Sequence, residues 1–149
     1  MDFEILGLIF LKSFNKLKSK CNEIDKKVET QCFSSNDINK IFDKVIKLNN
    51  SKRALCNVKV VIIETLKKLK NRQFLIDRYI IRLSIQELSE KYSIKSVSIP
   101  KKIKREVNKF CNVMIESFSK EFLIQIYETS DYIKNMYNDF INNKKGVYK

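Results

Sequence analysis

A chain of 149 residues that is 44% hydrophobic and carries a formal charge of +13 is long enough for one core, or for a small domain with an appended helical piece. Two glycines and one proline are too few turn residues for a many-stranded fold, so the composition predicts an all-α protein. The sequence contains no histidine, which excludes Ser-His-Asp and Cys-His catalysis and most metal sites, and two glycines cannot build a phosphate-binding loop. We therefore expect no enzyme, no cofactor and no metal site.

The N-terminal apolar run, residues 5–11, is much shorter than the roughly 20 residues that span a bilayer. Asp2 and Glu4 stand where a secretory signal carries positive charge. We expect a buried helix over residues 3–28, continuing through Phe14 and Leu17, and no membrane association.

The next elements are predicted from polar breaks and from apolar residues at steps of three and four. Ser34-Ser35-Asn36-Asp37 predicts the cap of a second helix that runs to Leu48. Asn49-Asn50-Ser51 predicts a break, and a third helix is expected over residues 52–69 despite its β-branched run.

The segment that follows is expected to contain three helices. Asn71 is predicted to cap a helix over residues 72–81, and Ser84 with Glu87 forms a capping box that begins a short second helix. Leu88 and Tyr92 are expected to face inward, and Ile94 to lie in a tight turn before the next helix.

That last helix is predicted to be amphipathic. Ile103, Val107 and Phe110 form its packing face. The remaining surface is basic, and its members are Lys101, Lys102, Lys104, Arg105 and Lys109.

The positive charge is concentrated in the same part of the chain. Residues 67–109 contain 13 Lys and Arg against 4 Asp and Glu, whereas residues 110–149 contain 5 of each. A local excess of this kind attracts a phosphate backbone, although a solvated basic face has the same composition.

The four cysteines form no CxxC pair that could hold zinc or exchange disulfides. We expect reduced, buried thiols of a cytoplasmic protein. They are Cys21, Cys32, Cys56 and Cys111.

The basic segment resembles region four of bacterial sigma-70-type factors, which is similar to the DNA-binding end of small phage and mobile-element transcription regulators. The resemblance covers residues 66–110 and rests on Arg78-Tyr79, Leu83-Ser84, Glu87-Leu88-Ser89-Glu90, Ile94 and Ser98-Ile99. It implies a helix-turn-helix whose second helix enters the major groove.

Three residues depart from the family pattern. Ser89 replaces a small alanine, and Ser93 replaces a turn glycine and so loses easy access to positive φ. Pro100 fits best at the first position of the recognition helix, which would then begin about two residues later than in the family.

The resemblance places one set of residues against double-stranded DNA. Arg105 has the planar fork suited to guanine, and the lysines are expected to hold phosphates. The predicted DNA-binding residues are Ser96, Ser98, Lys101, Lys102, Lys104 and Arg105, with Arg72 and Arg82 touching the backbone nearby.

The sequence thus predicts a DNA-binding transcription regulator with a helical N-terminal segment (1–65), a helix-turn-helix domain (66–110) and a C-terminal helical extension (111–149). One alternative is a minimal sigma-like factor that binds RNA polymerase, because Asp37-Ile38 and Ile41-Phe42 resemble an acidic-aliphatic polymerase-binding helix. A second is a helical protein-interaction module without DNA binding. The apolar residues beyond Phe110 are expected either to pack on the N-terminal helices or to form a homodimer.

Overall fold

The computed structural model describes residues 1–147, with side chains to residue 144, and over that range the protein is all-α, as its composition predicted. None of its described helices is both long enough and apolar enough to cross a lipid bilayer. The chain forms two compact units, and each unit combines segments that are far apart in sequence. The division into consecutive domains at 1–65, 66–110 and 111–149 stays a prediction.

Unit 1 comprises residues 1–15 and 61–120. It contains α1 (Phe3–Ser13), the end of α3 (Ile38–Lys67), α4 (Arg72–Leu75), a π-helical turn η2 (Ile76–Ile81), α5 (Ile85–Tyr92), a 3-10 turn η3 (Ser96–Ser98) and α6 (Ile99–Ser117). Its core contains fully buried Phe10 and Phe110, and α1 packs on α6. The packing is close at Gly7, where an added Cβ would lie 2.4 Å from Cys111 Sγ.

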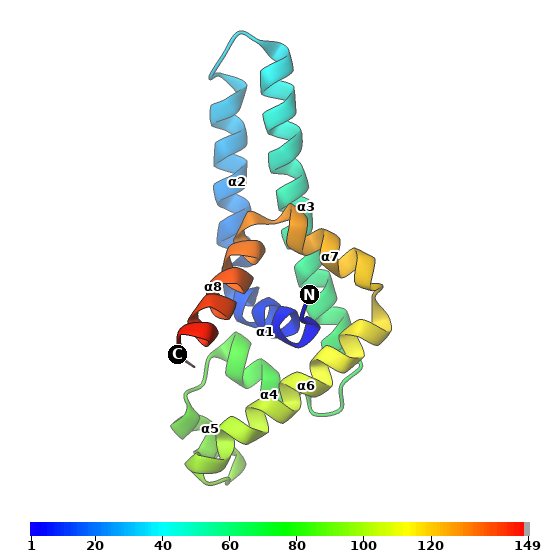
Figure 1. Cartoon of the computed structure of the whole chain (residues 1–149). Coiled ribbons are helices and arrows are strands. Elements are labelled where there is room, and N and C mark those ends of the chain that lie inside the picture. Colours follow the sequence, from blue (N-terminus) through cyan, green and yellow to red (C-terminus); the bar gives the residue numbers. More distant parts are fainter. Residues whose placement is uncertain (148–149) are drawn as a thin grey trace. The chain divides into compact units, whose positions relative to one another are not determined.

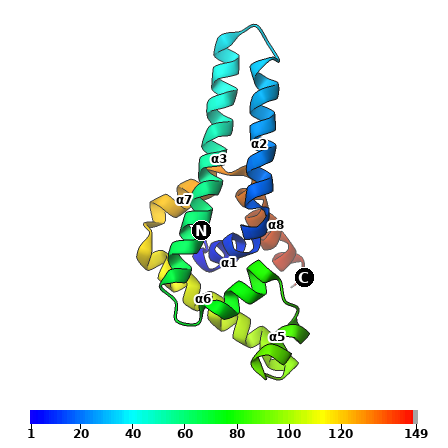
Figure 2. The ribbon, with the colours of Figure 1, turned by 180° about the vertical axis from the view of Figure 1, so that it is seen from behind.

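Unit 2 comprises residues 16–60 and 121–149. It contains α2 (Leu17–Cys32), most of α3, nearly all of α7 (Lys120–Thr129), and α8 (Asp131–Val147). α2 and the first half of α3 form an antiparallel hairpin, which both ribbon views show (Figures 1 and 2). An ion pair joins them, with Lys52 Nζ 2.7 Å from Asp25 Oδ1.

The hairpin has an arm, residues 18–53, in which no side chain is buried. Ile24, Val28, Ile41, Val45 and Leu48 are only half-buried along it. At the root, by contrast, Leu55, Val58, Leu123 and Ile133 are almost fully buried. The Ser51 hydroxyl donates to the carbonyl of Thr129 over 3.0 Å, which ties α3 to the end of α7.

The structure corrects two helix boundaries in the N-terminal half. The helix expected over residues 3–28 is interrupted by a 3-10 turn η1 (Phe14–Lys16), so that α1 and α2 are separate. The break expected at Asn49-Asn50-Ser51 is absent, and α3 continues through these residues to Lys67. Asparagine and serine each cost a helix only about 0.5 kcal/mol, and an apolar stripe that stays in register outweighs this.

Other local predictions are confirmed. Asp37 caps α3, because its Oδ1 accepts from the backbone N–H groups of Asn39 and Lys40 at 3.1 and 3.3 Å. The helix expected over residues 72–81 has those bounds, but only its first turn is α-helical and the remainder is η2.

The prediction of four buried thiols is confirmed only for Cys111, because Cys21 is half-buried and the other two are exposed. Cys111 is buried and its Sγ donates to the carbonyl of Glu4 over 3.4 Å, whereas Cys32 and Cys56 are exposed on the arm and near its root. The error arises because the two helices of the hairpin have little packed around them.

Candidate nucleic-acid interface

A small apolar cluster in unit 1 holds α4, α5 and α6 together. Phe74, Leu88 and Ile99 are its buried members, and Leu83, Tyr92, Ile94 and Ile103 pack around them. The rings of Phe74 and Tyr92 meet edge to face with centroids 5.3 Å apart. Each of the three helices thus contributes one fully enclosed side chain, which sets their mutual orientation.

The start of α5 is determined by the predicted capping box. Ser84 Oγ accepts from the Glu87 N–H at 3.1 Å, and the Ser84 N–H donates to Glu87 Oε1 at 3.4 Å. Arg82, at the end of η2, has a left-handed backbone with φ 69°. The chain therefore turns sharply between the basic end of η2 and α5.

A tight turn after Tyr92 separates α5 from α6. Ser93 adopts φ 54° even though it is not glycine, a conformation that costs an L-residue about 1–2 kcal/mol. The Ile94 N–H donates to the Ser89 carbonyl at 3.1 Å, and the Ser89 hydroxyl donates back to the Ile94 carbonyl. Ser89 is therefore small enough for this position, and its hydroxyl also stabilises the turn by its hydrogen bond to the Ile94 carbonyl.

α6 begins at Ile99, with Pro100 in its first turn, after the 3-10 turn at Ser96–Ser98. Ile99 has helical φ and ψ although it precedes proline, so the helix starts one residue earlier than the expectation that Pro100 would be its first residue. The proline lies where the helix has no use for its missing N–H.

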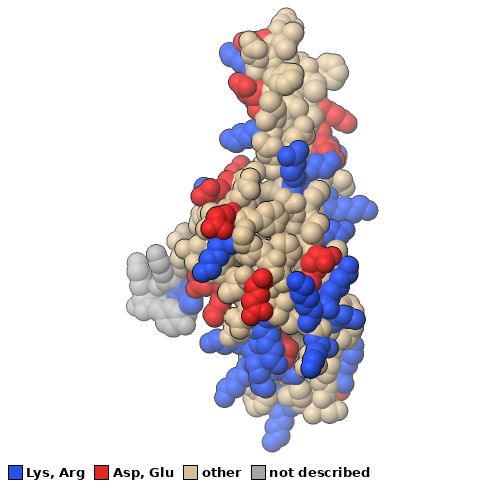
Figure 3. Space-filling view, turned by 90° about the vertical axis from the view of Figure 1, so that its right-hand side faces the viewer, with Lys and Arg blue, Asp and Glu red and all other residues tan. Residues whose placement is uncertain are grey.

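Three of the predicted DNA-binding residues share one exposed face of α6. Lys101, Lys104 and Arg105 lie at i, i+3 and i+4, and they make no hydrogen bond or ion pair with any described residue. Figure 3 shows Lys and Arg gathered over the part of unit 1 that contains α5 and the first part of α6.

Lys102 differs from these neighbours because its cation is already engaged. It lies 5.0 Å from the centroid of the Phe74 ring and 3.9 Å from Glu106 Oε1, and its side chain is only 23% exposed. Lys109 also pairs with Glu106, at 3.2 Å.

The other predicted residues are exposed to different degrees. Ser98 is exposed, whereas Ser96 is half-buried and its hydroxyl donates to Gln86 Oε1 at 3.2 Å. Arg82 is exposed at the turn before α5, and Arg72 is exposed with its guanidinium donating to the Lys67 carbonyl at 3.4 Å. The sequence prediction omitted Lys95, an exposed cation in the turn directly before Ser96. Its charge and its position next to the predicted site could have identified it as a candidate DNA-binding residue.

The four acids of the basic segment are all engaged within unit 1. Glu87 is in the capping box, Glu90 accepts from Gln86 at 3.2 Å, and Glu106 is buried beneath two lysines. The fourth, Asp77, has no exposed surface. Among the described residues none of the four acids pairs with Lys101, Lys104 or Arg105, and the segment as a whole keeps its excess of 13 Lys and Arg over 4 Asp and Glu.

Asp77 connects η2 to α5. It accepts from Gln73 at 2.8 Å, from the Tyr92 hydroxyl at 2.5 Å and from Lys91 at 2.7 Å. Burial raises the pKa of its carboxyl, but these three donors outweigh burial and hold the pKa below its usual value. Burial and the Asp77 carboxylate together raise the pKa of Tyr92 to about 12.

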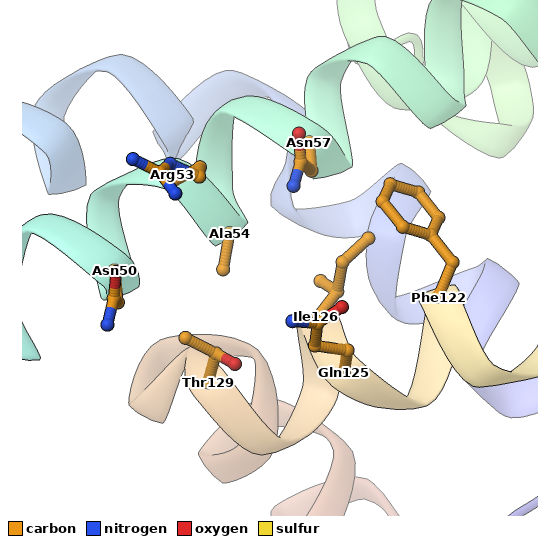
Figure 4. Close-up of a pocket in the computed structure, with 8 residues that line it drawn as sticks. All are labelled: Asn50, Arg53, Ala54, Asn57, Phe122, Gln125, Ile126 and Thr129. Atoms are coloured by element: carbon orange, nitrogen blue, oxygen red, sulfur yellow. The ribbon is translucent and has the colours of Figure 1, made fainter.

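A second concave region lies in unit 2, between α3 and α7 (Figure 4). This hollow of about 300 Å³ has Ala54, Ile126 and Phe122 as its apolar lining, with Arg53 as its one charged residue. Its remaining lining residues are Asn50, Asn57, Gln125 and Thr129. The set contains no nucleophile with an adjacent base, so it suggests no catalytic site.

Comparisons of the chain with protein families, with curated proteins and with solved structures gave no match.

Proposed function

We propose that this chain is a DNA-binding transcription regulator in which α5, the turn at Ile94 and α6 act as a helix-turn-helix. The observation that carries the proposal is the separation of charge in unit 1. Lys101, Lys104 and Arg105 share one face of α6 and pair with none of the described residues, and none of the four nearby acids contacts them in an ion pair. Unpartnered cations on one helical face suit a phosphate backbone, whose counterions they displace on binding.

The residues have different proposed roles. Arg105 presents a fork that can contact guanine in the major groove, whereas Lys101, Lys104 and Lys95 act as point charges for phosphates. Ser98, Arg82 and Arg72 are exposed and are proposed to contact the same duplex. Lys102 contributes less to DNA binding. To reach a phosphate, its ammonium group would have to give up its contacts with the Glu106 carboxylate and the Phe74 ring.

The test is binding of fluorescent duplexes over a range of salt concentrations, first with random DNA and then with a sequence selected by the protein. Lys101→Ala should weaken binding to all sequences and reduce the salt slope by about 1. Arg105→Ala should cost about 1–3 kcal/mol on the selected sequence and relax sequence preference. Lys102→Ala should have a smaller effect than Lys101→Ala.

Lys59→Ala, which removes an exposed lysine of α3 in the other unit, is the matched control and should leave binding unchanged. Absence of salt-dependent binding by the wild-type chain would refute DNA binding altogether. Equal affinity for selected and scrambled duplexes would refute sequence reading by Arg105 and leave only phosphate contact.

A minimal sigma-like factor is the second candidate. It is favoured by the exposure of Ile38 and Phe42, at 72% and 64%, in the segment that resembles a polymerase-binding helix. Copurification of the intact chain with RNA polymerase, lost in Phe42→Glu, would favour this function over a regulator that acts alone.

A further inference from the structure

Within the arm, one exposed face of α3 carries a strip of apolar side chains. Ile38, Phe42 and Ile46 follow one another at intervals of four residues and are 72%, 64% and 48% exposed. At 100° per residue, Lys40, Lys44 and Lys47 point to the opposite side of the helix, so the strip itself is free of lysine. Large exposed apolar side chains grouped in this way indicate a contact surface.

The arm lacks the tertiary packing that such a contact would provide. Over residues 18–53 no side chain is buried, so the two helices of the arm have only their own half-buried seam between them. Helices of this length are marginal in water without tertiary packing. A second helical hairpin laid on the strip would complete a four-helix bundle.

The pattern of the strip favours a second copy of the same chain as the partner that covers it. Ile38-x3-Phe42-x3-Ile46 reads the same in both directions about Phe42. In a two-fold antiparallel pair, Phe42 meets its own copy, and Ile38 meets Ile46 of the other chain twice. The two-fold axis makes the contacts reciprocal, and the symmetric spacing of the strip makes each of the three contacts apolar on both sides.

The local charge agrees with that occupant. The chain as a whole carries +13, which makes two copies repel one another. Residues 31–46, however, contain two lysines, Lys40 and Lys44, and two aspartates, Asp37 and Asp43, and so no net charge. The tip of the arm is thus a place where two copies can approach without large electrostatic cost.

We propose that the protein forms a homodimer through the Ile38–Phe42–Ile46 strip of α3, with Phe42 on the two-fold axis. The C-terminal helices fit this role less well, because Leu123, Ile126, Ile133 and Tyr137 are already buried. The inference does not depend on DNA binding, and its test contains no DNA.

The experiment is sedimentation velocity of the full chain in the micromolar range, with circular dichroism to confirm helical content. The wild type should be a dimer. Phe42→Glu and Phe42→Lys should each be monomeric, with a dissociation constant raised roughly thirtyfold or more, because each places two like charges on the axis. An equimolar mixture of the two variants should form a heterodimer, since Glu then faces Lys.

Val60→Glu is the matched control, because Val60 is also an exposed apolar residue of α3, 51% exposed, but lies outside the strip. It should remain dimeric. A monomeric wild type, a dimer that survives Phe42→Glu, or a mixture that stays monomeric would each overturn the proposal. A monomeric wild type is also the result expected if the strip binds RNA polymerase and not a second copy of the chain.

Discussion

Two phenylalanines illustrate how differently the two units are built. Phe110 of α6, in unit 1, has no exposed surface, whereas Phe33, at the end of α2 in unit 2, is 91% exposed. Unit 1 encloses Phe10, Phe74 and Phe110 in a closed core, although Val97 and Ile81 on its surface are 82% and 56% exposed, whereas no side chain of the arm in unit 2 is buried. We infer that unit 1 is held together by its own core and that the arm, which has none, is the part of the chain that gains most from contact with a partner.

The largest expected difference between the two units is in the free energy of unfolding, and it is tested by replacing each of the two phenylalanines with alanine. Phe110→Ala should lower the free energy of unfolding by about 3–5 kcal/mol, because it leaves a cavity in a closed core. Phe33→Ala should change it by less than about 0.5 kcal/mol. Urea unfolding followed by circular dichroism measures both, and comparable losses would show that the arm is packed as tightly as unit 1.

A second test compares a buried carboxylate with an exposed one. Asp77→Asn should cost about 1.5–3 kcal/mol, because it weakens charge-assisted hydrogen bonds from Lys91 and Tyr92 inside unit 1. Asp25→Asn, which breaks the ion pair with Lys52 on the arm, should cost less than about 1 kcal/mol, because both side chains are well exposed.

The pH dependence of stability sharpens the same comparison. Since the folded pKa of Asp77 lies below its ordinary value of 3.8, its stabilising effect is complete above that pH and is lost as the pH falls through the folded value. The wild type should therefore lose stability more steeply than Asp77→Asn below about pH 4. Parallel acid profiles would contradict the assigned network.

A third test concerns the close packing of α1 on α6. Gly7→Ala should cost about 1–2 kcal/mol, because the new methyl group meets Cys111 Sγ and Met114. The double substitution Gly7→Ala with Cys111→Ala should recover part of that loss by removing the sulfur atom. No recovery would mean that the cost arises from the backbone and not from this contact.

The smallest expected effect is a gain. Ser93→Gly should stabilise unit 1 by about 0.5–1 kcal/mol, because glycine adopts the left-handed backbone of this turn without strain. Ser19→Gly, in the first turn of α2 on the arm, should instead destabilise by up to about 0.5 kcal/mol. If both changes have the same sign, backbone conformation does not control the response at Ser93.

How much could be predicted from the sequence depended on how local the determining interactions are. The capping box at Ser84 and the cap at Asp37 involve residues two or three positions apart, and both were predicted correctly. The exposure of Lys101, Lys104 and Arg105 followed from helical periodicity alone. The all-α fold followed from composition.

Interactions between distant residues could not be predicted in this way. The engagement of Lys102 depends on the Phe74 ring, which belongs to a different helix. The continuation of α3 past Asn49-Asn50-Ser51 is supported in part by the Thr129 carbonyl, far along the chain. The exposed thiols of Cys32 and Cys56 depend on how little packs around the hairpin, which no local pattern records.

The pairing of α1 with α6 has a consequence for biosynthesis. α1 leaves the ribosome before α6, and the surface that covers it is made only when Cys111 and Met114 emerge, a delay on the order of 5–20 seconds at ordinary rates of translation. During that interval Leu6, Ile9 and Phe10 have no α6 to pack against. α1 is therefore expected to need shielding until residue 117, the end of α6, has left the ribosome.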